Sequence, residues 1–399
     1  MKAPQTSNKG KPDFFLLIMT LILVGFGIVM VFSASSSIAV VSSAFNHDAL
    51  YFTKRHLLFT AVGLFAMFFI MNLPYKFLRK NTKLYVVPVL ILLFTVPFLG
   101  VTKNGATGWF EFGPISIQPT EFAKLALILI LGKFIIVKGE QFRTIVHGLI
   151  PTSIIIISVA GITMIQPDYG SAFILIVTAC IMVWSGGANL KQLFAVGTLV
   201  TVAVSLILFI AYLNNPSSWD YRFARFLAFQ DPEKYMQDQS WHLVSSLQAL
   251  AHGGFTGAGF GEGIQKLHYL QYPYNDFIFA VIGEEFGFIG SALFILFYII
   301  FIWRGFSIAV RCPDPHGLVV GVGVTGLFAV QAFVNIAGVT GFIPMTGVTL
   351  PFISYGGSSL LVSLMCVGVL LSISREFNKQ VQPKVEVVKT KTRKETVYY

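Results

Sequence analysis

An acidic residue stands at the start of a long apolar stretch, and two more acids lie inside that stretch. Asp276 comes first, and Glu284 and Glu285 follow eight and nine residues later. A carboxylate at the head of a helix is suited to act as a general base toward a sugar hydroxyl, because the helix end can orient it. The same position suits an N-cap, so Asn275 or Asp276 could instead cap a helix that starts at Phe277. The residues alone leave both interpretations open.

Glu284 and Glu285 would lie roughly 12–14 Å further along such a helix than Asp276. Ionisable side chains at that depth in a bilayer cost several kcal/mol unless they have a partner or face a polar space. One interpretation is therefore a pair of buried, partnered structural acids, and the other is the lining of a polar cavity. Neither acid could reach the headgroup atom that Asp276 reaches.

A second candidate pair, Glu121 and Lys124, occurs three residues apart in ISIQPTEFAKL. This spacing places both side chains on one helix face, where they can form an ion pair. Ion pairs inside a membrane either stabilise the bundle or mark the path of a ligand. Trp109, just upstream, is either an interfacial anchor or part of the same site.

Arg222 and Arg225 share a face if their segment is helical, and guanidinium groups bind phosphates through paired hydrogen bonds. A lipid that carries a pyrophosphate is one candidate ligand, and ordinary lipid headgroups are the other. His242, His252 and His268 are ten and sixteen residues apart, without a second ligand type at metal spacing. They are interpreted as polar loop residues and not as metal ligands.

The composition identifies the surroundings of these residues. Of 399 residues, 55% are hydrophobic and 12% are charged, with a mean hydropathy of +0.74. A soluble domain carries about 25% charged residues. The apolar residues form runs of about 17–25, each long enough to cross a bilayer as a helix, and the strict alternation of barrel strands is absent. The net charge of +10 is assigned to cytoplasmic loops beside anionic membrane lipids and not to nucleic acid, because no basic stripe with interleaved aromatics occurs outside the spans.

The predicted fold is all-α, a polytopic membrane protein of about ten transmembrane helices with both termini in the cytoplasm. The spans are expected near 14–34, 56–73, 84–101, 120–137, 147–165, 170–186, 190–213, 276–303, 317–341 and 350–374. The loops on the inner side then hold most of the basic residues: Lys76, Arg79, Lys80, Lys83, Lys138, Arg143, Lys191, Arg304 and Arg311. Residues 1–13 form a short cytoplasmic segment, 14–374 the transmembrane domain, and 375–399 a basic cytoplasmic tail.

One outer loop, residues 214–275, is far longer than the others. Its twelve aromatic residues argue against disorder. Apolar spacing from Trp241 to Ala251 predicts a helix on the membrane surface. The following GGFTGAGFGEG stretch resembles a phosphate-binding loop only weakly, since no strand precedes it and no GK[ST] ends it. It suits a turn that lets the backbone approach another group closely.

These motifs together resemble the SEDS family (shape, elongation, division and sporulation), whose members include FtsW, RodA and SpoVE. The match is carried by TGVTLPFISYGGSSLL from Thr346, ISIQPTEFAKLA, QPDYGS from Gln166, YRFARFLAF from Tyr221, and SLQALAHGGFTGAGFGEGIQK from Ser246 into NDFIFAVIGEEFGFIG. They occur in the family's order. Two positions depart from the family pattern: Thr107 and Gly108 stand where basic residues are common, and LQYPYN precedes Asp276.

The resemblance implies a peptidoglycan glycosyltransferase that polymerises lipid II at the outer face of the bacterial cytoplasmic membrane. Asp276 matches the family's essential aspartate, Glu121 and Lys124 its acid and base near a central cavity, and Trp109 its loop tryptophan. Matched motifs add Lys266, Glu284 and Ser354 to the expected substrate-binding residues. Asp276 would accept the proton of an acceptor hydroxyl, and Arg222, Arg225, Lys124 or a divalent cation such as Mg²⁺ would offset the charge of the leaving pyrophosphate.

Two other functions stay open: a lipid II flippase, and a non-catalytic scaffold that activates a penicillin-binding protein. The expected partners are lipid II, a polyprenyl-pyrophosphate-linked glycan, membrane lipids and a class B penicillin-binding transpeptidase. Within the family, the IAGVTGFIPMTGVTLPF stretch and the basic tail favour the division or sporulation branch, with a location at the division septum.

Overall fold

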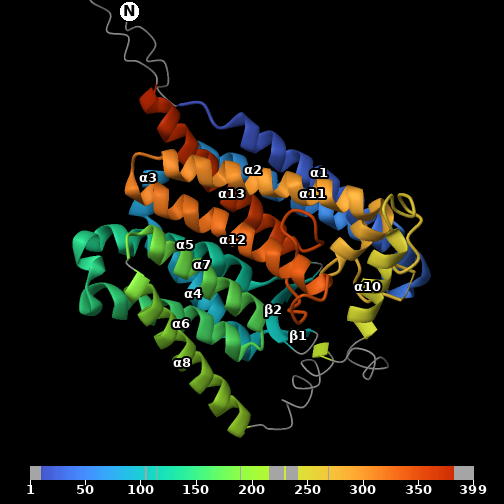
Figure 1. The fold of residues 1–399 in the computed structure, drawn as a ribbon, viewed down its shortest axis with the longest axis horizontal. Coiled ribbons are helices and arrows are strands. Elements are labelled where there is room, and N and C mark those ends of the chain that lie inside the picture. Colours follow the sequence, from blue (N-terminus) through green and yellow to red (C-terminus); the bar gives the residue numbers. More distant parts are fainter. Residues whose placement is uncertain are drawn as a thin grey trace, which may run out of the picture.

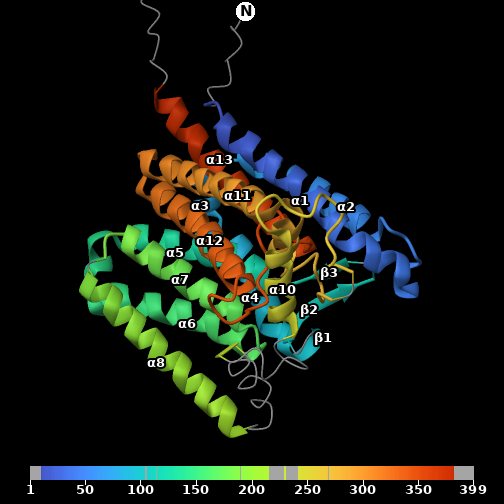
Figure 2. The same cartoon turned by 45° about the vertical axis from the view of Figure 1, so that its right-hand side comes forward.

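The computed structural model describes residues 10–103, 106–113, 115–188, 190–214, 229–230, 241–267 and 269–381. It is a bundle of long helices that pack side by side (Figures 1 and 2). The long helices are α1 Phe14–Val41, α2 Tyr51–Asn72, α4 Thr82–Leu99, α5 Pro119–Lys138, α6 Ile150–Ile165, α7 Tyr169–Ser185, α8 Leu190–Asn214, α11 Ile278–Arg311, α12 Pro315–Val339 and α13 Gly357–Val381. Shorter helices are α3 Tyr75–Lys80 and α10 Trp241–Gly253, with single turns η1 Ser43–Phe45, η2 Gly139–Arg143 and η3 Ile145–Leu149.

Each predicted span corresponds to one of the long helices, which confirms the polytopic helical fold. Within the described residues, eight stretches are long and apolar enough to cross a membrane. The remaining two predicted spans are α7, which has 17 residues, and α5, which carries Glu121 and Lys124 near its start. The last helix continues to Val381, seven residues beyond the predicted end of the last span at 374.

Both ends of the described chain meet at one end of the bundle, opposite α10 (Figure 1). Asp13 caps α1 by accepting a hydrogen bond from the Leu16 amide and pairs with Arg304 of α11 at 2.6 Å. The Asp13 amide donates to Ser374 Oγ of α13 at 3.0 Å. This arrangement agrees with the ten predicted spans, because a chain that crosses a membrane an even number of times has both termini on the same side.

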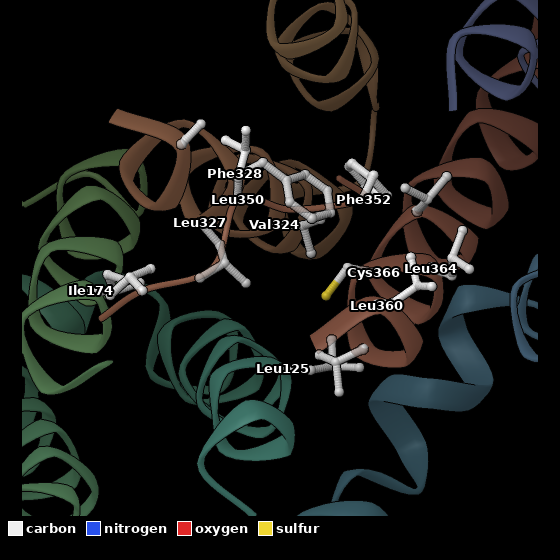
Figure 3. Packing of buried hydrophobic residues seen from close by; sticks show 14 of the residues in the cluster. Leu125, Ile174, Val324, Leu327, Phe328, Leu350, Phe352, Leu360, Leu364 and Cys366 are labelled. Atoms are coloured by element: carbon white, nitrogen blue, oxygen red, sulfur yellow. The ribbon is translucent and has the colours of Figure 1, made fainter. Parts of the chain in front are cut away.

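The hydrophobic core runs through the whole bundle, and one part of it packs α5, α7, α12 and α13 around the loop between α12 and α13 (Figure 3). Phe328 of α12 and Phe352 of the loop are each 1% exposed, with ring centroids 5.1 Å apart. Helix α8 lies at the margin of the bundle and packs against α6 and α7. Buried packing therefore surrounds the loop that carries the TGVTLPFISYGG motif.

A small antiparallel sheet between α4 and α5 was not predicted. Strands β1 Val101–Lys103, β2 Ala106–Phe112 and β3 Ile115–Ile117 pair in the order β1-β2-β3, with Val101 opposite Trp109 and Phe110 opposite Ile117. Two of the three strands have only three residues and leave almost no alternation in the sequence, and the pairing depends on the turns between the strands. The sheet lies near the end of the bundle where α10 lies (Figure 2).

Candidate active site

Helix α11 is broken at Gly287, nine residues after its start. Gly287 has φ 67° and ψ −165°, a conformation that only glycine adopts readily. A Cβ there would lie 2.3 Å from the Gly257 backbone nitrogen, so the break also brings another segment of backbone into contact. That segment is the glycine-rich stretch Gly253–Gly263, which was predicted to form a turn of close backbone approach.

The glycine-rich segment replaces the helix hydrogen bonds that the break removes. In an unbroken helix, the amides of Phe288 and Ile289 would donate to the carbonyls of Glu284 and Glu285. They donate instead to Gly254 and Phe255 at 2.9 and 3.1 Å, while the freed Glu284 and Glu285 carbonyls accept from Ala258 and Gly259 at 2.9 and 3.1 Å. Irregular backbone inside a membrane protein is stable only when every polar group is satisfied in this way.

The Glu284 side chain fixes the end of the same segment. Its carboxylate is fully buried and accepts hydrogen bonds from the Ile264 amide at 2.7 Å, the Gln265 amide at 3.1 Å and His252 Nδ1 at 3.0 Å. These donors come from α10 and from the residues that follow the glycine-rich stretch. Glu284 is therefore a partnered structural acid, as one of the two sequence interpretations proposed.

Glu285 pairs with Lys266 at 2.6 Å, and the side chains are 0% and 5% exposed. Lys266 also donates to Ser33 Oγ of α1 at 2.9 Å, and Ser33 donates to Glu285. A buried charge loses its hydration, so each of these two charged groups is stable there only with the other as its partner. These contacts give Lys266 and Glu284 structural roles, and their part in substrate binding stays a prediction.

Asp276 lies just before α11 and, unlike the two glutamates, is partly exposed. The helix begins at Ile278 with Phe277 in the N-cap position, so the predicted cap at Asn275 or Asp276 was wrong by one residue. The Asp276 carbonyl accepts from Asn335 Nδ2 of α12 at 2.8 Å, and this amide nitrogen also donates to the Val348 carbonyl at 2.7 Å. Asn335 thus ties the backbone at Asp276 to the loop after α12.

The side chain of Asp276 borders that same loop. A Cβ built at Gly347, which has φ 72°, would lie 3.6 Å from Asp276 Oδ2. Further along the loop, the Tyr355 amide donates to the Tyr274 carbonyl at 2.8 Å, and the two rings meet edge to face. Ser354 Oγ accepts from the Leu350 amide at 2.8 Å, which shapes the turn. Substrate binding by Ser354 stays a prediction.

The start of α7, which follows the turn at residues 166–168, packs on the same loop. A Cβ at Gly170 would lie 2.7 Å from the Thr346 carbonyl oxygen, so the start of α7 packs directly on the loop. The Asp168 side chain caps α7 by accepting from the Ser171 amide at 3.1 Å. Burial raises the pKa of the Asp168 carboxyl, and the nearby Lys124 charge opposes that shift.

The predicted ion pair of Glu121 and Lys124 is present at 2.7 Å in the first turns of α5 and is buried. Its helix start is joined to the same turn, because Thr120 donates to Gln166 Oε1 at 3.2 Å and Gln118 Nε2 donates to Asp168 at 3.4 Å. Trp109 is half-buried in β2, and its neighbour Gly108 lies beside Gln166. Their roles toward a substrate stay predictions.

Several predicted features fall elsewhere. Arg222, Arg225 and His268 lie outside the described residues. Helix α10 is present, with Trp241 and Leu247 on its exposed face and Leu243 and Ala249 buried. Its place on the membrane surface stays a prediction. Among the residues that the structure describes, no group of three or more His, Cys, Asp or Glu side chains is arranged to hold a metal ion.

Two residues of this region were not singled out from the sequence. Asn335 is 2% exposed within an apolar span, and a polar amide at that depth is itself a signal of a specific partner. Asp168 was read only as part of a motif. A carboxylate between two apolar runs is the corresponding signal, and its position one residue before α7 explains its capping role.

Comparison with known proteins places this arrangement in a family. A family model described as "Cell cycle protein", for FtsW, RodA and SpoVE, matches residues 14–379. Stage V sporulation protein E of Bacillus subtilis is 40% identical over 373 residues, covering 93% of this chain and 99% of its own. A probable peptidoglycan glycosyltransferase FtsW of Trichlorobacter lovleyi is 39% identical, covering 91% of this chain and 93% of its own.

Solved structures match over the same length. A chain of a peptidoglycan synthase complex, reported for the structural coordination of polymerization and crosslinking, has a TM-score of 0.74 at 27% identity and covers 92% of this chain and 98% of its own. Rod shape determining protein RodA of Thermus thermophilus has a TM-score of 0.66 at 25% identity, covering 92% and 97%. The chain therefore belongs to the FtsW, RodA and SpoVE family of cell cycle proteins.

Proposed function

We propose that this multi-pass membrane protein is a peptidoglycan glycosyltransferase that polymerises lipid II at the outer face of the bacterial cytoplasmic membrane. The name of the Trichlorobacter lovleyi relative, which is 39% identical, supports the activity. The observation that carries the proposal is the placement of Asp276. It is a partly exposed carboxylate at the bundle end, where the loop after α12 and the start of α11 meet.

The proposed reaction is a displacement with inversion at a sugar carbon. Asp276 accepts the proton of the GlcNAc 4-hydroxyl of an acceptor lipid II. That oxygen forms a bond to the anomeric carbon of MurNAc on the growing lipid-linked strand, and the bond from this carbon to polyprenyl pyrophosphate breaks. General-base assistance of this kind is typically worth about 10²–10⁴-fold in rate.

Charge on the leaving pyrophosphate needs a cationic partner. We assign this role to Arg222 and Arg225, which the family motif YRFARFLAF contributes. Lys124 fits the role less well, because it is 2% exposed and already paired with Glu121. Bound Mg²⁺ would serve the same end as the arginines.

We further propose that the chain works with a class B penicillin-binding transpeptidase at the division septum. The TM-score of 0.74 to a chain of a peptidoglycan synthase complex that couples polymerization to crosslinking supports such a partner. The similarity to FtsW and stage V sporulation protein E supports the division or sporulation branch.

The direct test supplies purified protein with lipid II and looks for glycan chains by gel electrophoresis, with and without the transpeptidase. A polymerase produces chains that disappear with Asp276→Asn. A flippase produces none under either condition. A scaffold produces none alone or with a transpeptidase. With a penicillin-binding protein that itself polymerises, it gives chains that survive Asp276→Asn, which would refute the assignment.

A further inference from the structure

A basic pocket lies at the end of the bundle opposite Asp276, between α3, α4 and α5. It has a volume of about 510 Å³ and is lined by Lys80, Lys83 and Lys133, together with Asn81 and an apolar floor that includes Val87. Lys76, on the adjacent α3, pairs with Glu376 of α13. The pocket is thus at the end where the termini meet, which the distribution of basic loop residues assigns to the cytoplasm.

The three lysines have no counter-ion within the described part of the chain. Their neighbours do: Lys76 pairs with Glu376 at 3.2 Å and Arg79 with Asp314 at 3.7 Å. None of Lys80, Lys83 and Lys133 forms a comparable pair with a described carboxylate. Three like charges around one open pocket repel each other, and an anion relieves that repulsion.

An apolar groove continues from this pocket toward the middle of the bundle. It also has a volume of about 510 Å³, is lined by α4, α5 and α6, and shares Val87 with the basic pocket. Ser158 is its one polar lining residue. Ile91, Phe94 and Ile154 are each more than half exposed, so the groove opens to the outside of the bundle, where the acyl chains of lipids lie.

The length of the groove matches one leaflet of a bilayer. From Leu84 at the pocket to Phe94 at the far end of the groove, α4 advances ten residues, about 15 Å at 1.5 Å per residue. Half of a hydrocarbon core near 30 Å is also about 15 Å. A charged pocket joined to an apolar groove of this depth has the shape of a lipid that stands in one leaflet.

We propose that this face of α4, α5 and α6 binds an anionic phospholipid of the cytoplasmic leaflet. Its phosphate lies among Lys80, Lys83 and Lys133, and one acyl chain lies along the groove. Basic pockets between transmembrane helices on the cytoplasmic side are suited to anionic headgroups. A polyprenyl phosphate shares the headgroup charge, but a groove one leaflet deep fits an acyl chain better than a long polyprenyl chain.

Native mass spectrometry of the full-length protein in detergent tests the proposal, with phosphatidylglycerol, phosphatidylcholine and a polyprenyl phosphate as separate probes. The wild type should retain phosphatidylglycerol over phosphatidylcholine by at least about tenfold, given three lysine contacts. The variant K80Q/K83Q/K133Q should lose this preference. The matched control K76Q/K138Q/K191Q removes the same charge from the same end of the bundle and should keep it.

The groove is tested independently of the charges. Ser158 is exposed, so Ser158→Phe fills the groove without removing core packing and should reduce the retention of phosphatidylglycerol severalfold. Equal retention of the two phospholipids by the wild type would overturn the proposal. So would equal losses in the two triple variants, or displacement of phosphatidylglycerol by the polyprenyl phosphate at equal concentration.

Discussion

The two acids inside α11 and the acid just before it have opposite surroundings. Glu284 and Glu285, inside α11, are buried and held by amides, a histidine and a lysine. Asp276, just before the helix, is partly exposed and borders the loop after α12. The difference in burial distinguishes acids with a structural role from an acid that can take part in the reaction. An acid whose oxygens are held by buried donors fixes the fold, whereas an accessible acid on a fixed backbone can meet a substrate.

The contacts around Glu284 and Glu285 also help to hold Asp276 in place. The backbone hydrogen bonds that join residues 254–259 to α11 on both sides of Gly287 fix one end of the segment that leads to Asp276. Asn335 fixes the other end through the Asp276 carbonyl. Asp276 therefore stands on a backbone that is anchored on both sides, which is the support that a catalytic group needs.

The largest effect on stability should come from separating the Lys266–Glu285 pair. Glu285→Leu alone leaves a buried ammonium without its partner and should lower the free energy of unfolding by about 3–5 kcal/mol. The double variant Lys266→Met/Glu285→Leu should recover most of that loss. Thermal unfolding in detergent measures both, and a double variant as unstable as the single one would contradict the structural role of the pair.

Gly287→Ala should cause the next largest loss of stability. The new Cβ would meet the Gly257 nitrogen at 2.3 Å and impose strain at φ 67°, which costs about 1–3 kcal/mol. Gly25→Ala in α1, where a Cβ meets nothing within 4 Å, is the matched control. Equal melting temperatures for the two variants would show that the break in α11 does not depend on close backbone contact.

The smallest loss of stability is expected at the end of the bundle where the termini meet, opposite Asp276. Arg304 is 26% exposed and pairs with Asp13 at 2.6 Å. Arg304→Met should cost about 1 kcal/mol, and added salt should narrow its difference in stability from the wild type, because a partly exposed pair is weaker than a fully buried one and is screened by salt. Lys54→Met, at a more exposed pair with Asp48, should cost still less. A loss as large as that of Glu285→Leu would remove the contrast between the two ends.

The sequence was sufficient for the helices because each span carries its own signal in about twenty apolar residues. It was not sufficient for the sheet between α4 and α5 or for the exchange at Gly287, because both depend on backbone pairing between segments whose contact only the folded chain creates. The partner of Glu285 was missed for the same reason, since Lys266 is nineteen residues away in a loop.

The site shows the same division. The ion pair of Glu121 and Lys124 follows from their spacing, and the structure confirms it. Asp276 stood out as an acid at the head of an apolar run, but its cap role was misplaced by one residue because Phe277 precedes the first helical residue. Asn335 carried a readable signal, while its two acceptors, the Asp276 and Val348 carbonyls, belong to other segments.

The most direct measurement compares Asp276→Asn with Glu284→Gln in one lipid II polymerisation assay, normalised to folded protein, with melting temperatures recorded for both. We expect Asp276→Asn to melt like the wild type and to lose about 10²–10⁴-fold in rate. Glu284→Gln should melt at a lower temperature and keep most of its rate per folded molecule. A wild-type rate in Asp276→Asn would contradict the assignment of Asp276 as the general base.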